Sequence, residues 1–212
     1  MLYGCDISHW QGDLFDFTDY DFVIAKASEG VTYTDPCFQL NMERALRDKK
    51  LIGAYHYARP ENNSAKDEAL NFVKTVKPYV GKCLLALDWE ATALKYPVEW
   101  ALEWLLEVER LTGVVPLIYC SESYVKNLGI IAENGNGLWC AKWGDDKPKY
   151  NPFNVLAIWQ YTSNPHDKDV FYGDERAWSL YCTPSRKAEE VHECQFCKDF
   201  DKFLQEHGYV KR

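Results

Sequence analysis

The stretch from Leu84 to Glu90 constrains the fold of this chain more than any other segment. Four apolar residues, Leu-Leu-Ala-Leu, lead directly into Asp88, Trp89 and Glu90. A continuous apolar run of this kind is typical of a strand that is buried on both faces, as in a parallel sheet. Because side chains alternate along a strand, the two carboxylates are expected on one side and Trp89 on the other.

Two carboxylates at this spacing favour acid–base chemistry. Their Cα atoms should lie about 6–7 Å apart, at roughly 3.3 Å per residue. Ionising both groups is costly at that distance, so the pKa of one should rise. A carboxylic acid with a raised pKa beside a charged partner is what the hydrolysis of a glycosidic bond requires. The alternative is a strand end with two solvated acids, and the pair alone does not decide between them.

Apolar periodicity along the chain predicts an α/β fold. Helices are expected over 36–49, from Ser64 to 76 and over 97–111, with Gly113 ending the last one. The late strands have little helix between them, so the fold begins as a β/α barrel and ends with more β than an ideal one. The predicted strands are 3–7, 22–27, 51–57, 83–89, 114–120, 138–143 and 156–161.

Polar and aromatic side chains stand at the carboxyl ends of all seven predicted strands. In a barrel these ends converge on one mouth, where active sites are built. We therefore expect one functional site at this mouth. The side chains concerned are Asp6, Lys26 with Glu29, His56 with Tyr57, Asp88 with Glu90, Tyr119, Lys142 with Trp143, and Gln160.

Composition excludes several classes of function. The net charge is −8, which argues against a nucleic-acid partner. No apolar run approaches the roughly 18–20 residues of a membrane span, and no polybasic run suggests a membrane surface. Residues 1–6 lack the regions of a signal peptide, so synthesis in the cytoplasm is expected. Without export, the eight cysteines are expected to be reduced and mostly buried rather than disulfide-bonded.

Six segments, in order along the chain, resemble a known family. They read DISHWQG at 6–12, IAKASEG at 24–30, GAYHY at 53–57, LDWE at 87–90, LIY at 117–119 and IWQY at 158–161. The resemblance is to glycoside hydrolase family 25, the Chalaropsis-type lysozymes found among phage endolysins and bacterial autolysins, and it covers residues 2–175. It implies a modified TIM-like (β/α)5β3 barrel that hydrolyses the β-1,4 bond between N-acetylmuramic acid and N-acetylglucosamine in bacterial peptidoglycan, without metal or cofactor.

The resemblance also implies roles for individual acids. Glu90 would be the general acid, and Asp88 would orient the 2-acetamido group of the substrate in a retaining, substrate-assisted reaction. Asp6 matches the first essential aspartate of the family, as nucleophile or as electrostatic stabiliser. The fourth acid belongs to a D-x-x-x-F-x-G pattern. That pattern fits 167–173 and selects Asp167, with Asp169 as the alternative.

The residues that match the substrate groove of the family each have a structural alternative. Lys26 would otherwise only pair with an acid in the barrel mouth, and Tyr57 and Tyr119 would only pack. His9 and His56 suggest a metal site, but a lone histidine at a strand end is more often hydrogen-bonded. The matching groove residues are Lys26, Glu29, Tyr57, Tyr119, Trp143 and Gln160.

The chain is expected to form one barrel over 1–180 and a short extension over 181–212, and a monomer is favoured. Apolar residues at helical spacing, Val191, Cys194, Cys197, Phe200 and Leu204, predict that the extension is an amphipathic helix packed on the barrel. The alternative is a zinc site formed by Cys182, His192, Cys194 and Cys197, whose spacing fits no standard finger.

Two other functions compete with wall lysis by an endolysin-like enzyme. A chitinase-like hydrolase would show D-x-x-D-x-D-x-E, but Ala86 and Cys83 occupy two of its acid positions before Glu90. The second alternative is a glycan-binding domain without catalysis, against which the presence of all four expected acids argues.

Overall fold

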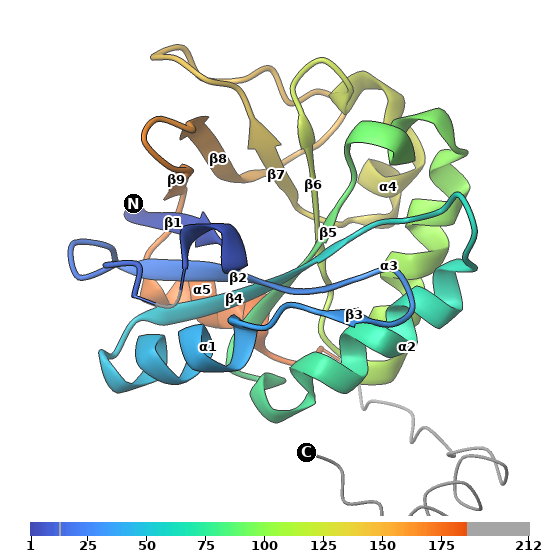
Figure 1. The fold of residues 1–212 in the computed structure, drawn as a ribbon. Helices are drawn as coiled ribbons and strands as arrows, with labels where there is room; N and C mark the ends of the chain where they lie inside the picture. Colours follow the sequence, from blue (N-terminus) through green and yellow to red (C-terminus); the bar gives the residue numbers. More distant parts are fainter. Residues whose placement is uncertain (13, 186–212) are drawn as a thin grey trace, which may run out of the picture.

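The computed structural model describes residues 1–12 and 14–185. Strands and helices alternate through the first two thirds of the chain, and the last strands follow one another without an α-helix between them (Figure 1). The strands are β1 (Leu2–Ile7), β2 (Phe22–Glu29), β3 (Tyr33–Thr34), β4 (Leu51–Tyr57), β5 (Cys83–Asp88), β6 (Leu117–Ser121), β7 (Leu138–Ala141), β8 (Leu156–Thr162) and β9 (Lys168–Phe171). The α-helices are α1 (Phe38–Arg47), α2 (Ala65–Val76), α3 (Val98–Thr112), α4 (Gly129–Asn134) and α5 (Glu175–Cys182).

Eight of these strands close into a barrel. Their order is β1-β9-β8-β7-β6-β5-β4-β2, and β2 pairs with β1 to complete the ring, while β3 is attached only to β2. The strands from β1 through β2, β4, β5, β6 and β7 to β8 are parallel, and β9 is antiparallel to both of its neighbours. The modified α/β barrel predicted from the sequence is confirmed. In its first connection the described residues form the 3-10 helix His9–Gln11 instead of an α-helix.

The interior of the barrel is filled by large apolar side chains. They include Phe22, Ile24, Leu84, Trp139 and Phe171, all almost completely buried. Trp178 of α5 packs against the rings of Phe22 and Phe171, with centroids 4.7 and 5.1 Å away. Phe22 opens β2 and Phe171 ends the antiparallel β9, so α5 closes the end of the barrel opposite the carboxyl ends of the parallel strands. In the described part of the chain, the mouth at the carboxyl ends of the parallel strands is the end of the barrel left open for a site.

A second apolar layer lies between the strands and the outer helices. The outward side chains of β2, β4 and β5 pack against the apolar faces of α1, α2 and α3. Local signals set the helix ends. Ser64 accepts a hydrogen bond from the Asp67 amide at the start of α2, and Gly113 ends α3 with φ of 75°, as the sequence predicted.

Some predicted boundaries are wrong. Strand β6 begins at Leu117 instead of 114, and β7 ends at Ala141 instead of 143. Strand β9 was not predicted, because its four residues, KDVF, alternate too briefly to show a period of two. Helix α5 runs through the expected domain boundary at 180. Residues 186–212 of the expected extension, including His192, Cys194 and Cys197, lie outside the described residues.

The cysteines of the barrel behave as small apolar side chains, as predicted. Burial raises the pKa of their thiols; for Cys140 it reaches about 12. The buried free thiols include Cys5, Cys83, Cys120 and Cys140, and Cys37 is buried as well. In the part of the chain that the structure describes, no helix is both long and apolar enough to cross a membrane.

Candidate active site

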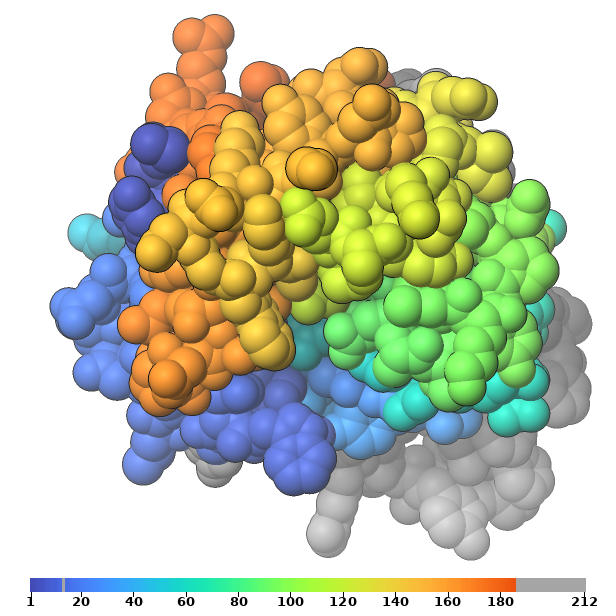
Figure 2. All heavy atoms as spheres, turned by 90° about the horizontal axis from the view of Figure 1, so that it is seen from above, coloured from blue at the N-terminus to red at the C-terminus, as the bar shows by residue number. Residues whose placement is uncertain are grey.

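Two neighbouring pockets open at the carboxyl ends of the parallel strands. The first, here called the carboxylate pocket, has a volume of about 420 Å³, and the second, here called the outer pocket, about 740 Å³. They adjoin where β4 pairs with β5, since Tyr57 of the outer pocket is opposite Asp88 of the carboxylate pocket. In the view from above, the blue, green and orange segments surround a hollow (Figure 2). The carboxylate pocket is lined by Asp6, Tyr55, Asp88, Glu90, Tyr119, Trp139, Trp143, Gln160, Ser163 and Asp167.

Asp88 and Glu90 reach the carboxylate pocket from the end of β5. Strand β5 ends at Asp88, and Glu90 keeps an extended backbone with φ of −144° and ψ of −176°. The side chain between them, Trp89, is fully buried on the other side, where it stacks on Trp100 with centroids 5.7 Å apart. The alternation predicted from the sequence is therefore confirmed, and both carboxyl groups face the same pocket.

Burial and mutual repulsion hold both groups toward their protonated forms. The pKa of Asp88 lies well above its usual value because of burial first and then the charges of Glu90 and Asp6. The pKa of Glu90 is raised by burial and by Asp167. Lys26 opposes both shifts. The buried Oδ1 atom of Asp88 has no hydrogen-bond partner among the described residues. It is an acceptor available to a ligand in the pocket.

Asp6 is held from beneath the pocket by Gln160. The Gln160 Nε2 group donates to Asp6 Oδ2 over 2.8 Å. The amide cannot be turned around, because its Oε1 atom accepts from the Tyr119 hydroxyl at 3.2 Å and from the Trp143 indole at 3.3 Å. Burial and the charge of Asp167 raise the pKa of Asp6 from 3.8 to about 7, although the Gln160 bond lowers it. Asp6 can therefore change its charge near neutral pH.

Asp6→Asn is expected to stabilise the protein at alkaline pH. Because the folded-state pKa of Asp6 is raised, its stabilising contribution is present below about pH 4 and is lost as the pH rises through about 7. Asparagine removes that loss. The increase in Tm of the variant over the wild type should be several degrees larger at about pH 8 than at about pH 4, since about 1 kcal/mol shifts Tm by about 2–4 °C in a domain of this size.

Thermal unfolding at both pH values measures this effect, with the exposed Asp19→Asn as the matched control. An equal Tm difference at the two pH values would contradict the raised pKa of Asp6.

The two candidates for the fourth acid lie in different environments. Asp167 lines the carboxylate pocket and is partly exposed, and burial raises its pKa. Asp169, two residues further along β9, has no exposed surface and accepts a hydrogen bond from the Trp139 indole over 2.8 Å. Of the two, only Asp167 borders the space that a substrate would occupy.

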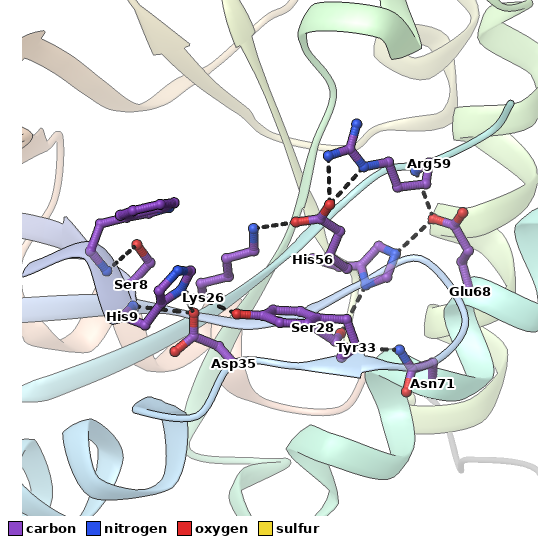
Figure 3. A network of polar contacts seen from close by, with 12 residues as sticks. Ser8, His9, Lys26, Ser28, Tyr33, Asp35, His56, Arg59, Glu68 and Asn71 are labelled. Atoms are coloured by element: carbon purple, nitrogen blue, oxygen red, sulfur yellow. Dashed lines mark hydrogen bonds and ion pairs between the residues drawn. The ribbon is translucent and has the colours of Figure 1, made fainter. Parts of the chain in front are cut away.

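The outer pocket contains a chain of alternating charges (Figure 3). Lys26 Nζ lies 2.5 Å from Glu29 Oε2, and the other Glu29 oxygen pairs with the Arg59 guanidinium at 2.6 Å. The Tyr57 ring lies between the two cations, each 4.8 Å from its centroid. Lys26 thus pairs with an acid, which was the alternative to a role in the substrate groove. It also lines a pocket together with Glu29 and Tyr57.

Exposed tryptophans stand at the edges of both pockets. Trp10 of the outer pocket is 82% exposed and Trp143 of the carboxylate pocket is 65% exposed. Indole rings with open faces suit the apolar faces of sugar rings, and their N–H groups can bond to hydroxyl groups. The lining therefore combines aromatic surfaces with charged groups, as a groove for a polar polymer of sugars would.

Two side chains expected at the mouth are not in either pocket. His56 is fully buried beneath α2, where it bonds to Ser28 and Glu68 over 2.8 Å each. It points outward because Tyr55 and Tyr57, its neighbours on β4, point to the mouth. Lys142 instead lies 3.5 Å from Glu122.

His9 bonds to buried Asp35 at 2.7 Å. Among the described residues, no group of three acidic, histidine or cysteine side chains is arranged to hold a metal ion.

Sequence reasoning missed several residues of the two pockets. Tyr55 and Trp139 line the carboxylate pocket, and both lie inside predicted strands, where an inward aromatic side chain looks like core. Arg59 lies in the loop just after β4, and Trp10 lies in the 3-10 helix His9–Gln11 just after β1. The signal that could have identified them was their position a few residues after a strand end, because the segments that follow barrel strands build the site.

Comparisons with known proteins identify the family of the chain. The model of the family Glycosyl hydrolases family 25 matches residues 5–170. A lysozyme of Streptococcus phage Cp-9 is 28% identical over 163 residues, which cover 72% of this chain and 47%, about half, of the phage protein.

Solved structures give the same result for the fold. A muramidase from Acremonium alcalophilum superposes with a TM-score of 0.75 at 25% identity, covering 86% of this chain and 99% of that protein. The modular Cpl-1 endolysin, solved in complex with a peptidoglycan analogue, gives a TM-score of 0.60 at 26% identity, covering 82% of this chain and 54% of the endolysin.

Proposed function

The chain belongs to glycosyl hydrolases family 25 and is a peptidoglycan hydrolase of the lysozyme type, and we propose that the four acids of the carboxylate pocket perform this reaction. The bond cleaved is the β-1,4 bond between N-acetylmuramic acid and N-acetylglucosamine. One observation supports the proposal most: Asp88 Oδ1, a buried carboxyl oxygen that has no hydrogen-bond partner in the described part of the chain, lies two residues from Glu90 in a pocket with two further acids.

Glu90 acts as the general acid. Burial and the charge of Asp167 raise its pKa, which favours the protonated form that a general acid needs, and its side chain is less buried than that of Asp88, so it can reach a glycosidic oxygen. As the bond between the anomeric carbon and the leaving oxygen breaks, Glu90 donates its proton to that oxygen. The Glu90 carboxylate later accepts a proton from the water that attacks the anomeric carbon, which restores the enzyme.

Asp88 orients the internal nucleophile of the substrate. The acetamido N–H of the muramic acid donates to Asp88 Oδ1, and the acetamido oxygen forms a bond to the anomeric carbon from the face opposite the leaving group. The cyclic oxazolinium ion that results is positive, so it favours the ionised form of Asp88, and the Asp88 carboxylate stabilises it. Water then attacks the anomeric carbon from the first face, the bond to the acetamido oxygen breaks, and the sugar is released with its original anomeric configuration.

Asp6 and Asp167 supply electrostatic stabilisation in this proposal. Both line the carboxylate pocket together with Glu90, whose pKa Asp167 raises. Lys26, Glu29 and Tyr57 in the outer pocket, and Tyr119, Trp143 and Gln160 in the carboxylate pocket, hold the glycan on either side of the cleaved bond. A bacterial wall is therefore the partner, and synthesis in the cytoplasm stays a prediction from the sequence.

The anomeric configuration of the first product tests this mechanism. Proton NMR of a soluble peptidoglycan oligosaccharide during digestion should show the β-anomer of the new muramic acid end before mutarotation produces the α-anomer. A substrate whose muramic acid has a free amine in place of the acetamido group should be cleaved at least about 10²-fold more slowly. Initial formation of the α-anomer would contradict the substrate-assisted route and indicate direct attack by water.

A further inference from the structure

Asp169 lies in the barrel interior directly beneath the catalytic acids. On β9 it is opposite Gly4 of β1 and opposite Gln160 of β8. Residues that pair across a sheet share a face, and Asp6 lies two residues beyond Gly4, so Asp6, Gln160 and Asp169 project to the same side. Asp169 has no exposed surface, whereas Asp6 reaches the carboxylate pocket.

The two oxygens of Asp169 have different surroundings. Oδ1 accepts the Trp139 indole N–H over 2.8 Å. Oδ2 is buried and receives no hydrogen bond from an N–H or hydroxyl group of the described residues. The Asp169 carboxyl group is in hydrogen-bond contact with Asp6. Two carboxyl groups can form a hydrogen bond only when one of them is protonated, because ionised carboxylates are acceptors alone.

The surroundings identify which of the two holds the proton. Asp6 already accepts from Gln160, whose orientation is fixed by two donors, so Asp6 is arranged as an acceptor. The charged groups that act on Asp169 are Asp6 and Asp167, and both are acids. The other titratable groups near it are neutral hydroxyl and thiol groups at neutral pH, those of Cys5, Tyr20, Tyr119 and Tyr161.

We propose that Asp169 stays protonated at neutral pH and donates its hydroxyl hydrogen to Asp6. Asp169 is then a positioning residue: it touches no substrate but gives Asp6 a second donor, beside Gln160. The two donors orient the Asp6 carboxylate and favour its ionised form. Consistently, burial and the charge of Asp6 raise the pKa of Asp169 well above its usual value, and the bond to Asp169 lowers the pKa of Asp6.

The Asp169→Asn variant distinguishes between a protonated and an ionised Asp169. Asparagine can accept from Trp139 and donate to Asp6, so kcat/KM is expected to stay within about threefold of the wild type. The acidic limb of its pH profile should also stay in place. If Asp169 is instead ionised, asparagine removes a negative charge beside Asp6, the pKa of Asp6 falls, and the acidic limb moves to lower pH by about one unit. That shift overturns the proposal.

Asp169→Leu removes the donor altogether. The acidic limb should then move to higher pH, and kcat/KM near neutral pH should fall about tenfold or more, because Asp6 is ionised less. Asp19→Asn, at an exposed position, is the matched control that should change neither quantity. An unchanged profile in a folded Asp169→Leu protein would also contradict the proposal.

An infrared measurement tests the proton without catalysis and so stays valid if Asp169→Leu does not fold. The spectrum of the wild type minus that of Asp169→Asn, at about pH 7, should contain the carbonyl band of a protonated carboxylic acid. A difference spectrum with a carboxylate band in its place overturns the proposal. Because no substrate is added, this result does not depend on the roles proposed for Glu90 and Asp88. A failed wall digestion and a failed proton assignment are therefore distinguishable.

Discussion

Glu90→Gln is expected to lower kcat for peptidoglycan cleavage by about 10³-fold, within the 10²–10⁴ range of general acid catalysis. Glutamine has nearly the same shape as glutamate but cannot give a proton to the leaving oxygen. Within residues 1–12 and 14–185, Glu90 is hydrogen-bonded through its backbone alone, and its side chain is only partly buried. Binding of glycan fragments should therefore persist, and a fragment titration against the inactive variant should give a wild-type Kd.

The leaving group supplies a sharper test of this role. A substrate that releases a nitrophenolate hardly needs a proton, so the loss in Glu90→Gln should be much smaller with it than with the wall. Glu133→Gln, on the exposed side of α4, is the matched control and should retain full activity. Normal cleavage of purified walls by Glu90→Gln would show that another group is the acid. Equal losses on both substrates would indicate a defect other than proton donation.

Asp88→Asn is expected to lower kcat by about 10²–10³-fold with little change in KM, the magnitude found when one electrostatic stabiliser of a developing charge is removed. Asparagine keeps an oxygen that can accept the acetamido N–H, but it has no charge to stabilise the oxazolinium ion. The variant should also be more stable near neutral pH. The folded-state pKa of Asp88 is raised, so its stabilising contribution is present at low pH and lost as the pH rises through that pKa.

A double comparison isolates the Asp88 interaction. Wild type and Asp88→Asn are each assayed on normal oligosaccharides and on oligosaccharides whose muramic acid lacks the acetyl group. If Asp88 acts through the acetamido group, the two losses are not additive, and the doubly changed pair is about as slow as either single change. Additive losses would mean that Asp88 acts on something else, and the substrate-assisted route would have to be abandoned.

The sequence predicted the parts of the site that obey strand periodicity. The run of four apolar residues predicted a buried strand, and side chains alternate along a strand. Asp88 and Glu90 therefore face one pocket, and Trp89 faces the other side. His56 was expected at the same mouth, and the same alternation, applied from Tyr57, sends it outward to Glu68. That error came from treating every polar residue at a strand end as part of the mouth.

Features that depend on closure of the barrel could not be predicted. Strand β9 is short and antiparallel, and it exists because β1 and β8 both need a partner. The family pattern selected Asp167, but the physical reason lies in this strand: Asp167 borders the pocket, while Asp169 is buried against Trp139. Arg59 also could not be predicted, because it joins the site from the loop after β4 by pairing with Glu29 at the end of β2.

Identification of the new reducing ends tests the central claim most directly. Purified peptidoglycan is digested, the products are reduced with borohydride, and the reduced sugars are identified by mass spectrometry. Cleavage after N-acetylmuramic acid, as the account predicts, gives reduced muramic acid and no reduced glucosamine beyond the undigested control. Reduced glucosamine ends would contradict the bond specificity. The absence of new ends from several types of wall would mean that the pocket binds glycan without cleaving it.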